Sequence, residues 1–135
     1  MVASAGTDII VGGLLVRALE STGLPGGGGM KVGAHVSTAG GLSKSIDRAQ
    51  EIGAEAIQIF ASSPRAWAFK SPSEEEMLAF REKSAEADVA PTFLHGSYLV
   101  NVGGAPELIE KSVESLASHM NVAGQIGVAG VIFHG

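Results

Sequence analysis

Short apolar runs alternate with longer segments of helical spacing along most of this chain, and that alternation restricts the possible folds most strongly. The runs begin near Lys31, Ala56, Pro91 and Gly130, and an amphipathic segment separates each run from the next. A β-α-β-α-β-α-β order with continuous apolar strands is typical of a parallel sheet with right-handed crossovers. The chain is therefore predicted to be α/β, as part of a (β/α)8 barrel or as an open doubly wound sheet.

Two of the connecting segments carry clear signs of where a helix begins. Ser73 stands three residues before Glu76, which is the spacing of a capping box. The next segment has Pro106 near its first turn, where proline is tolerated, and His119 beside its apolar stripe is interpreted as a surface residue. The predicted stripe comprises Ile109, Val113, Leu116, Met120 and Ala123.

Residues 1–29 differ in composition from the rest of the chain. Pro25 is followed by four glycines and then by Met30, and such a glycine run is typical of a flexible linker. We therefore expect residues 1–29 to be a flexible extension and residues 30–135 to form the folded domain. The alternative is a short helix from Ile9 to Leu19 that packs on the domain.

Composition limits the class of protein and the kind of metal site. The chain has 135 residues, 45% of them hydrophobic, which is enough for one ordinary domain with a sizeable core. It has no cysteine, so thiolate metal sites are excluded and a cytoplasmic location is expected. The net charge of −5 argues against a purely electrostatic nucleic-acid binder. No apolar segment is long enough to span a membrane, and no signal peptide is evident.

Three of the four histidines fall at the carboxyl ends of the predicted strands. His35 ends the first, His95 the third and His134 the fourth, while Arg65 lies just past the second. The carboxyl ends of parallel strands face one way, so these side chains should meet on the edge where such folds place their chemistry. Imidazole is a common ligand of zinc, manganese and iron. The alternative is that each histidine is a hydrogen-bonded structural residue.

Tyr98 and Leu99 come directly after the third strand, at the same predicted edge. An apolar pair in such a loop usually serves packing. It could also act as a wedge between stacked bases or as a lid over a small substrate.

Four separated motifs together resemble the amino-terminal half of the endonuclease IV family, the metal-dependent apurinic/apyrimidinic endonucleases of DNA base-excision repair. They are GAHVSTAGGL, IQIFASSPRAW, LHGSYLVN and VIFHG, in that order between residues 30 and 135. The resemblance implies a (β/α)8 TIM barrel, here its first four βα-type units, with a trinuclear zinc cluster at the strand carboxyl ends. It implies hydrolysis of the phosphodiester 5′ to abasic sites in double-stranded DNA by a protein that is monomeric when complete.

The same resemblance implies roles for individual residues. His95 and His134 match zinc ligands. Tyr98 and Leu99 match the pair that the family inserts into DNA at the lesion, and Arg65 matches a residue that assists them.

Two further positions are less direct. His35 is expected to contact a metal ligand rather than the metal itself, or to face the DNA. Gly96 stands where the family often has an acidic residue after the first histidine. This weakens the expectation that a neighbouring side chain hydrogen-bonds the metal-binding His95.

The chain is about half as long as the roughly 250 residues usual for a complete barrel. The family's other zinc ligands, including a bridging glutamate, would follow Gly135, so no catalytic residue is assigned within this chain. A catalytic zinc usually needs three protein ligands, and we expect the chain alone to be inactive. Open sheet edges at the first and fourth strands are expected to favour self-association.

Two alternatives remain at this point. One is a sugar isomerase or epimerase of the xylose isomerase-like barrels, which share a metal-bearing edge. The other is a non-catalytic half-barrel that dimerises through its open edges.

Overall fold

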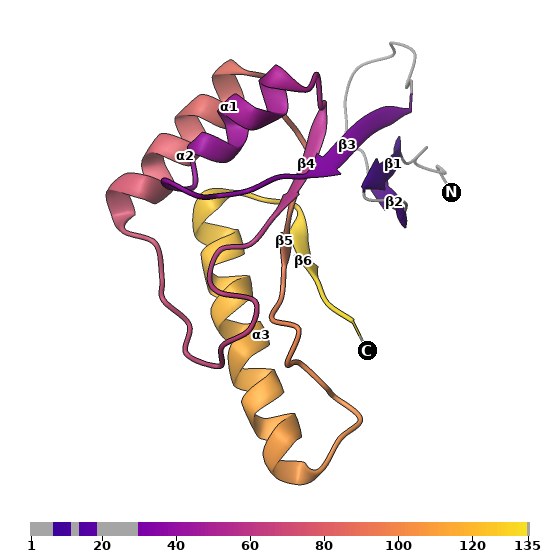
Figure 1. Cartoon of the computed structure of the whole chain (residues 1–135), viewed down its shortest axis with the longest axis vertical. Coiled ribbons are helices and arrows are strands. Elements are labelled where there is room, and N and C mark those ends of the chain that lie inside the picture. The colour runs from indigo at the N-terminus through magenta and orange to yellow at the C-terminus, as the bar shows by residue number, and fades with distance from the viewer. Residues whose placement is uncertain (1–6, 12–13, 19–29, 135) are drawn as a thin grey trace, which may run out of the picture.

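A computed structural model describes residues 7–11, 14–18 and 30–134. Six strands form one sheet in the order β2-β1-β3-β4-β5-β6, and three helices lie on one side of strands β3–β6 (Figure 1). The strands are β1 (Thr7–Val11), β2 (Leu14–Ala18), β3 (Lys31–His35), β4 (Ala56–Ile59), β5 (Thr92–His95) and β6 (Gly130–Ile132). The helices are α1 (Lys44–Glu51), α2 (Glu74–Glu86) and α3 (Pro106–Ile126).

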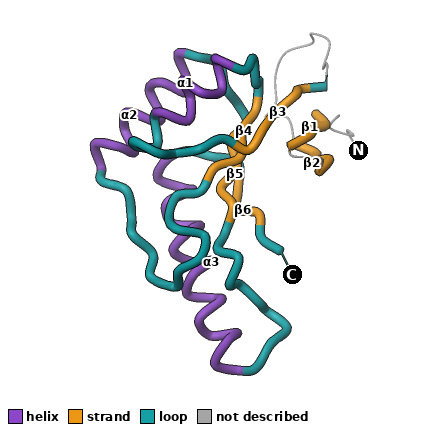
Figure 2. The backbone as a smooth tube through the Cα atoms, viewed as in Figure 1, coloured by secondary structure: helices purple, strands orange, loops and turns teal. Residues whose placement is uncertain are grey.

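Strands β3–β6 form the parallel sheet that the alternation of the sequence predicted. Each pairs in parallel with the next, and the registers place His35 opposite Gln58 and His95 opposite Ile132. A helix connects each strand to its neighbour, as the alternating colours along the chain show in Figure 2. The α/β prediction and the four-strand order are therefore confirmed.

The helices bury a single core against one face of this sheet. The capping box at the start of α2 is present in full, with the Ser73 hydroxyl accepting from the Glu76 amide and the Glu76 carboxylate accepting from the Ser73 amide. Gly33 lets β3 approach β4 closely, because a Cβ there would lie 2.5 Å from the Ala56 carbonyl oxygen. The most deeply buried large side chains of the core are Ile46, Ile57, Ile59, Phe80, Leu94 and Val122.

The amino-terminal residues contain two strands, so the alternative of a helix from Ile9 to Leu19 is wrong. β1 and β2 pair antiparallel, and β1 pairs in parallel with β3 through Ile9–Lys31 and Ile10–Val32. Residues 1–6, 12–13 and 19–29, the last with the glycine run, lie outside the described residues. The prediction that residues 1–29 are a flexible extension therefore stays a prediction. The edge of β3 that was expected to be open is covered by β1, while β6 is the last strand of the described sheet.

Helix α3 is rotated relative to its predicted stripe. Val113 and Met120 are each 56% exposed, whereas His119, expected on the surface, is only 3% exposed. The buried face comprises Ser112, Ser115, His119, Val122, Ala123 and Ile126. Polar side chains can lie there because backbone groups satisfy them: the Ser112 hydroxyl contacts the Leu108 carbonyl at 2.7 Å, and His119 Nδ1 contacts the Ser115 carbonyl at 2.8 Å. Among the described residues, no helix has the length and apolar character that crossing a bilayer requires.

Candidate metal centre and nucleic-acid interface

The three predicted histidines meet at the carboxyl ends of the parallel strands. His35 ends β3, His95 ends β5, and His134 lies just past β6. The Nε2 atoms of His95 and His134 are 3.1 Å apart, and the ring centroids of His35 and His95 are 6.1 Å apart. The Phe60 ring lies between His35 and His95, with its centroid 4.6 Å from that of His35 and 5.1 Å from that of His95. The expected convergence of these rings on one edge therefore occurs.

The Nε2 atoms of His95 and His134 lie at hydrogen-bond distance from each other, a separation that would also suit two ligands of one ion. The Gly96 carbonyl can only accept a hydrogen bond, so His95 Nδ1, at 2.7 Å from it, carries the proton and leaves the lone pair on Nε2. Two nitrogens bound tetrahedrally to zinc at about 2.0–2.1 Å would stand about 3.3 Å apart, close to the observed separation. A backbone carbonyl thus gives His95 the outer partner that metal-binding histidines usually have, despite the glycine at residue 96.

His35 lies beside this pair without joining it. Its Nδ1 is 2.9 Å from Nε2 of Gln58, and this contact holds the ring on the side of β3 that faces β4. Burial lowers the pKa of His35, and the neighbouring His95 lowers it further, so His35 favours the neutral state. In the part of the chain that the structure describes, no three His, Cys, Asp or Glu side chains gather as a metal site. The donors therefore fit a zinc ion in part, with two imidazoles where a catalytic site usually has three protein ligands.

Tyr98 and Leu99 lie on the loop after β5, directly beside the histidines. Tyr98 is 54% exposed, and its ring stands edge-on to Phe60 and His95 at centroid distances of 5.5 Å each. Leu99 is partly exposed, and Arg65 is exposed on the loop after β4. The two loops are joined, because the Tyr98 amide donates to the Pro64 carbonyl at 2.8 Å. The structure thus brings the predicted DNA-binding residues to the same edge as the predicted metal ligands.

Sequence reasoning missed Phe60, Gln58 and Ser97 at this edge. Gln58 carried a usable signal, since a polar residue inside a short apolar strand needs a partner when it is buried. It is 9% exposed and finds that partner in His35. Phe60 and Ser97 carried no such signal, because their positions depend on how the strands and loops come together.

Two known proteins illustrate what this sequence is similar to. No family model matches the chain. Endonuclease 4 of Thermus thermophilus is 42% identical over 106 residues, covering 77% of this chain and 39% of that protein. Probable endonuclease 4 of Chloroflexus aggregans is 37% identical over 105 residues, covering 77% of this chain and 37% of that protein.

A solved structure agrees with these sequence matches. The crystal structure of endonuclease IV from another strain of Thermus thermophilus superposes with a TM-score of 0.74 at 42% identity, over 77% of this chain and 39% of that one. This chain is a partial homologue of the endonuclease IV family.

The match to endonuclease IV also decides between the two predicted sheet types. Strands β3–β6 and their helices correspond to part of the endonuclease IV barrel, so the TIM-barrel prediction is confirmed over an open doubly wound sheet. A second structure, described as that of AsfvAP:AG, shares the fold with a TM-score of 0.62 at 17% identity. The chain spans less than two fifths of the length of the curated endonuclease IV relatives named above.

Proposed function

We propose that this chain carries part of the zinc site and the lesion-reading loops of an endonuclease that hydrolyses the phosphodiester 5′ to abasic sites in double-stranded DNA. The observation that carries the proposal is the pairing of His95 and His134, 3.1 Å apart, beside an exposed Tyr98. Endonuclease relatives at 37–42% identity favour a nuclease over the sugar isomerase alternative. We also propose that the protein takes part in DNA repair and is located in the cytoplasm.

The chemistry divides between the metal and the protein. Zinc, when bound, would activate water and neutralise charge on the phosphodiester oxygens. His95 and His134 would hold it through Nε2, and the Gly96 carbonyl would keep the proton of His95 on Nδ1, so that the Nε2 lone pair faces His134. With two imidazoles and no assigned catalytic residue, the chain alone is proposed to be inactive.

The loops would supply recognition. Tyr98 and Leu99 would enter the duplex where a base is missing, since unstacking costs least at a damaged position. Arg65, on the neighbouring loop, brings a guanidinium to the same edge of a chain whose net charge is −5. Local contact with the lesion, rather than general attraction to phosphate, would therefore dominate binding.

Zinc titration tests the metal part of this proposal. We expect the chain to bind zinc in competition with a coloured chelator, and His95→Ala or His134→Ala to weaken binding by more than the roughly 10–100-fold seen when an outer partner is lost. His35→Ala is the matched control, because it removes a neighbouring imidazole outside the pair. Equal losses in all three variants would contradict the assignment.

Fluorescence anisotropy with two duplexes tests the recognition part. One duplex contains a tetrahydrofuran abasic analogue and the other is intact. We expect preference for the abasic duplex, lost in Tyr98→Ala combined with Leu99→Ala. Incision of the abasic duplex by the unmodified chain in added zinc would overturn the proposal that the chain alone is inactive.

A further inference from the structure

One buried hydroxyl ties together the two loops that carry the proposed DNA-reading residues. Ser97 is 2% exposed, and its Oγ donates to the Pro64 carbonyl at 2.9 Å. The same oxygen accepts from the Leu99 amide at 3.2 Å, while the Tyr98 amide donates to the Pro64 carbonyl at 2.8 Å. Pro64 precedes Arg65, so these bonds connect the Arg65 loop with the Tyr98–Leu99 segment.

A second buried serine holds the far end of that segment. Ser112 on α3 is fully buried, and its Oγ accepts from the Asn101 amide at 2.9 Å. Tyr98 and Leu99 therefore lie between two anchors, one on the neighbouring loop and one on a helix. The backbone on both sides of Tyr98 is therefore held, in addition to the contacts of its ring with Phe60 and His95.

We propose that Ser97 is a positioning residue, which fixes Tyr98 and Leu99 relative to Arg65 before DNA is bound. The inference rests on the proposed function, because it concerns how that site recognises a lesion. Binding through an ordered loop loses less conformational freedom than binding through a loose one, so fixing the loops in advance strengthens binding. Serine suits the position because its hydroxyl donates and accepts at once.

Replacement of Ser97 by alanine is informative because the site is buried. Ser97→Ala keeps the Cβ and removes both hydroxyl bonds, and water has little access to replace them. The Tyr98–Pro64 backbone bond remains, so the loops should loosen rather than detach. Ser84→Ala is the matched control, since the Ser84 hydroxyl also donates to a loop carbonyl, that of Val89 at 2.9 Å, away from this edge.

The chain contains one tyrosine and one tryptophan, which makes the loop arrangement measurable. Tyr98 lies on one joined loop and Trp67 on the other. We expect tyrosine-to-tryptophan energy transfer in the DNA-free chain to change in Ser97→Ala and to stay at the unmodified value in Ser84→Ala. Unchanged transfer in Ser97→Ala would overturn the proposal.

Abasic-duplex affinity supplies the second readout. Losing hydrogen bonds of ordinary strength should weaken binding of Ser97→Ala about two- to tenfold, with Ser84→Ala unaffected. Altered energy transfer with unchanged affinity would overturn the role in recognition. If the unmodified chain shows no preference for the abasic duplex, the proposed function fails, and energy transfer alone decides whether Ser97 couples the loops.

Circular dichroism would first establish that each variant is folded. If Ser97→Ala does not fold, Ser97→Cys takes its place, because a thiol keeps the shape but is a weak donor and acceptor. The same change in transfer is then expected from the cysteine variant, and its absence contradicts the proposal.

Discussion

The two ends of the parallel sheet are built differently. At the amino ends of the strands, residues 52–55, 87–91 and 127–129 connect helix to strand in short turns, each with one residue of positive φ: Gly53, Asp88 and Gly127. At the carboxyl ends, residues 60–73 and 96–105 form longer loops that carry the predicted recognition residues. Short turns fix how helices and strands meet, whereas long loops can present side chains without changing that frame.

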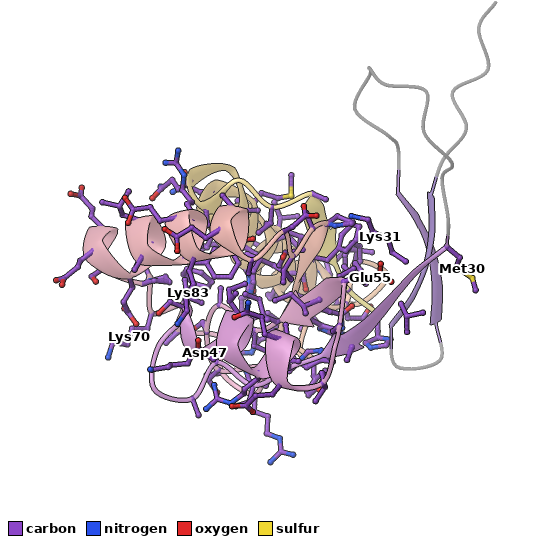
Figure 3. The ribbon with its side chains drawn as sticks, turned by 90° about the horizontal axis from the view of Figure 1, so that it is seen from above. Met30, Lys31, Asp47, Glu55, Lys70 and Lys83 are labelled. Atoms are coloured by element: carbon purple, nitrogen blue, oxygen red, sulfur yellow. The ribbon has the colours of Figure 1, made fainter. Side chains whose placement is uncertain are left out.

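Two side chains at the amino end bind the backbone of neighbouring segments. Lys31 Nζ donates to the Ala90 carbonyl at 2.6 Å, and a Glu55 carboxylate oxygen accepts from the Val32 amide at 3.0 Å. Figure 3 shows Lys31 and Glu55 close together on this side of the molecule. This end therefore stabilises the fold, while the other end gathers the imidazoles and the exposed aromatic. Substitutions at the two ends should accordingly change different measured quantities.

The largest loss of stability is expected in the core, next to one of the turns at the amino end of the sheet. Phe80 on α2 is 1% exposed, and Phe80→Ala should lower the free energy of unfolding by about 3–5 kcal/mol through lost contacts and a cavity. Leu78, on the same helix but 53% exposed, is the control, and Leu78→Ala should stay within about 0.5 kcal/mol. Urea denaturation measures both, and equal losses would show that α2 packs differently.

A smaller loss is expected from crowding two strands. Gly33→Ala would place a Cβ 2.5 Å from the Ala56 carbonyl oxygen and should destabilise the chain by about 1–3 kcal/mol. Gly124 on α3 has open space around it, so Gly124→Ala should instead stabilise the chain by about 0.5–1 kcal/mol. Thermal unfolding of the two variants should shift in opposite directions, and shifts of the same sign would contradict the close approach of β3 and β4.

A weaker effect is expected from an ion pair between helices. The hydrogen bond from Lys83 on α2 lowers the pKa of the Asp47 carboxyl on α1 below its ordinary value of 3.8, and Figure 3 shows the two side by side. A lowered pKa in the folded state stabilises the fold above the ordinary pKa, and this contribution is lost as the pH falls through the lowered value.

The side chains of Lys83 and Asp47 are 34% and 35% exposed, so solvent screens the pair. Asp47→Asn should therefore cause only a small loss of stability near neutral pH, one that shrinks below about pH 4. Urea denaturation at several pH values measures it. A difference that grows as the pH falls would contradict the sign.

The smallest effect on stability is expected at the carboxyl end. Tyr98 is 54% exposed, so Tyr98→Ala should change the free energy of unfolding by less than about 1 kcal/mol while abolishing preference for an abasic duplex. Denaturation and anisotropy on the same sample would separate the two effects. A large loss of stability would mean that this end also supports the fold, and the contrast between the two ends would fail.

Several features were predictable because they depend on neighbours in sequence. The spacing of Ser73 and Glu76 predicted a capping box that forms in full, and the apolar runs predicted strands β3–β6 within a residue or two. Placing His35, His95 and His134 at strand ends also predicted their shared edge, because parallel strands point the same way. The metal and DNA roles of these residues stay predictions.

Other features could not be predicted because they depend on distant partners. His119 on α3 packs against Phe69 from the loop before α2, with ring centroids 4.7 Å apart. The predicted stripe on α3 was partly wrong, because Val113 and Met120 are exposed while Ala123 is buried. The amino-terminal strands escaped prediction because β1 pairs with β3 across residues that resemble a linker.

The sequence by itself determined the order of strands and helices from β3 to β6, the start of α2 and the edge on which the histidines gather. Those properties follow from local periodicity, capping and the common direction of parallel strands. Only the tertiary structure decided that His95 and His134 face each other through Nε2, and that Ser97 links the loops of Arg65 and Tyr98. Such contacts join residues 39 and 33 positions apart, and no local pattern encodes the distance between them.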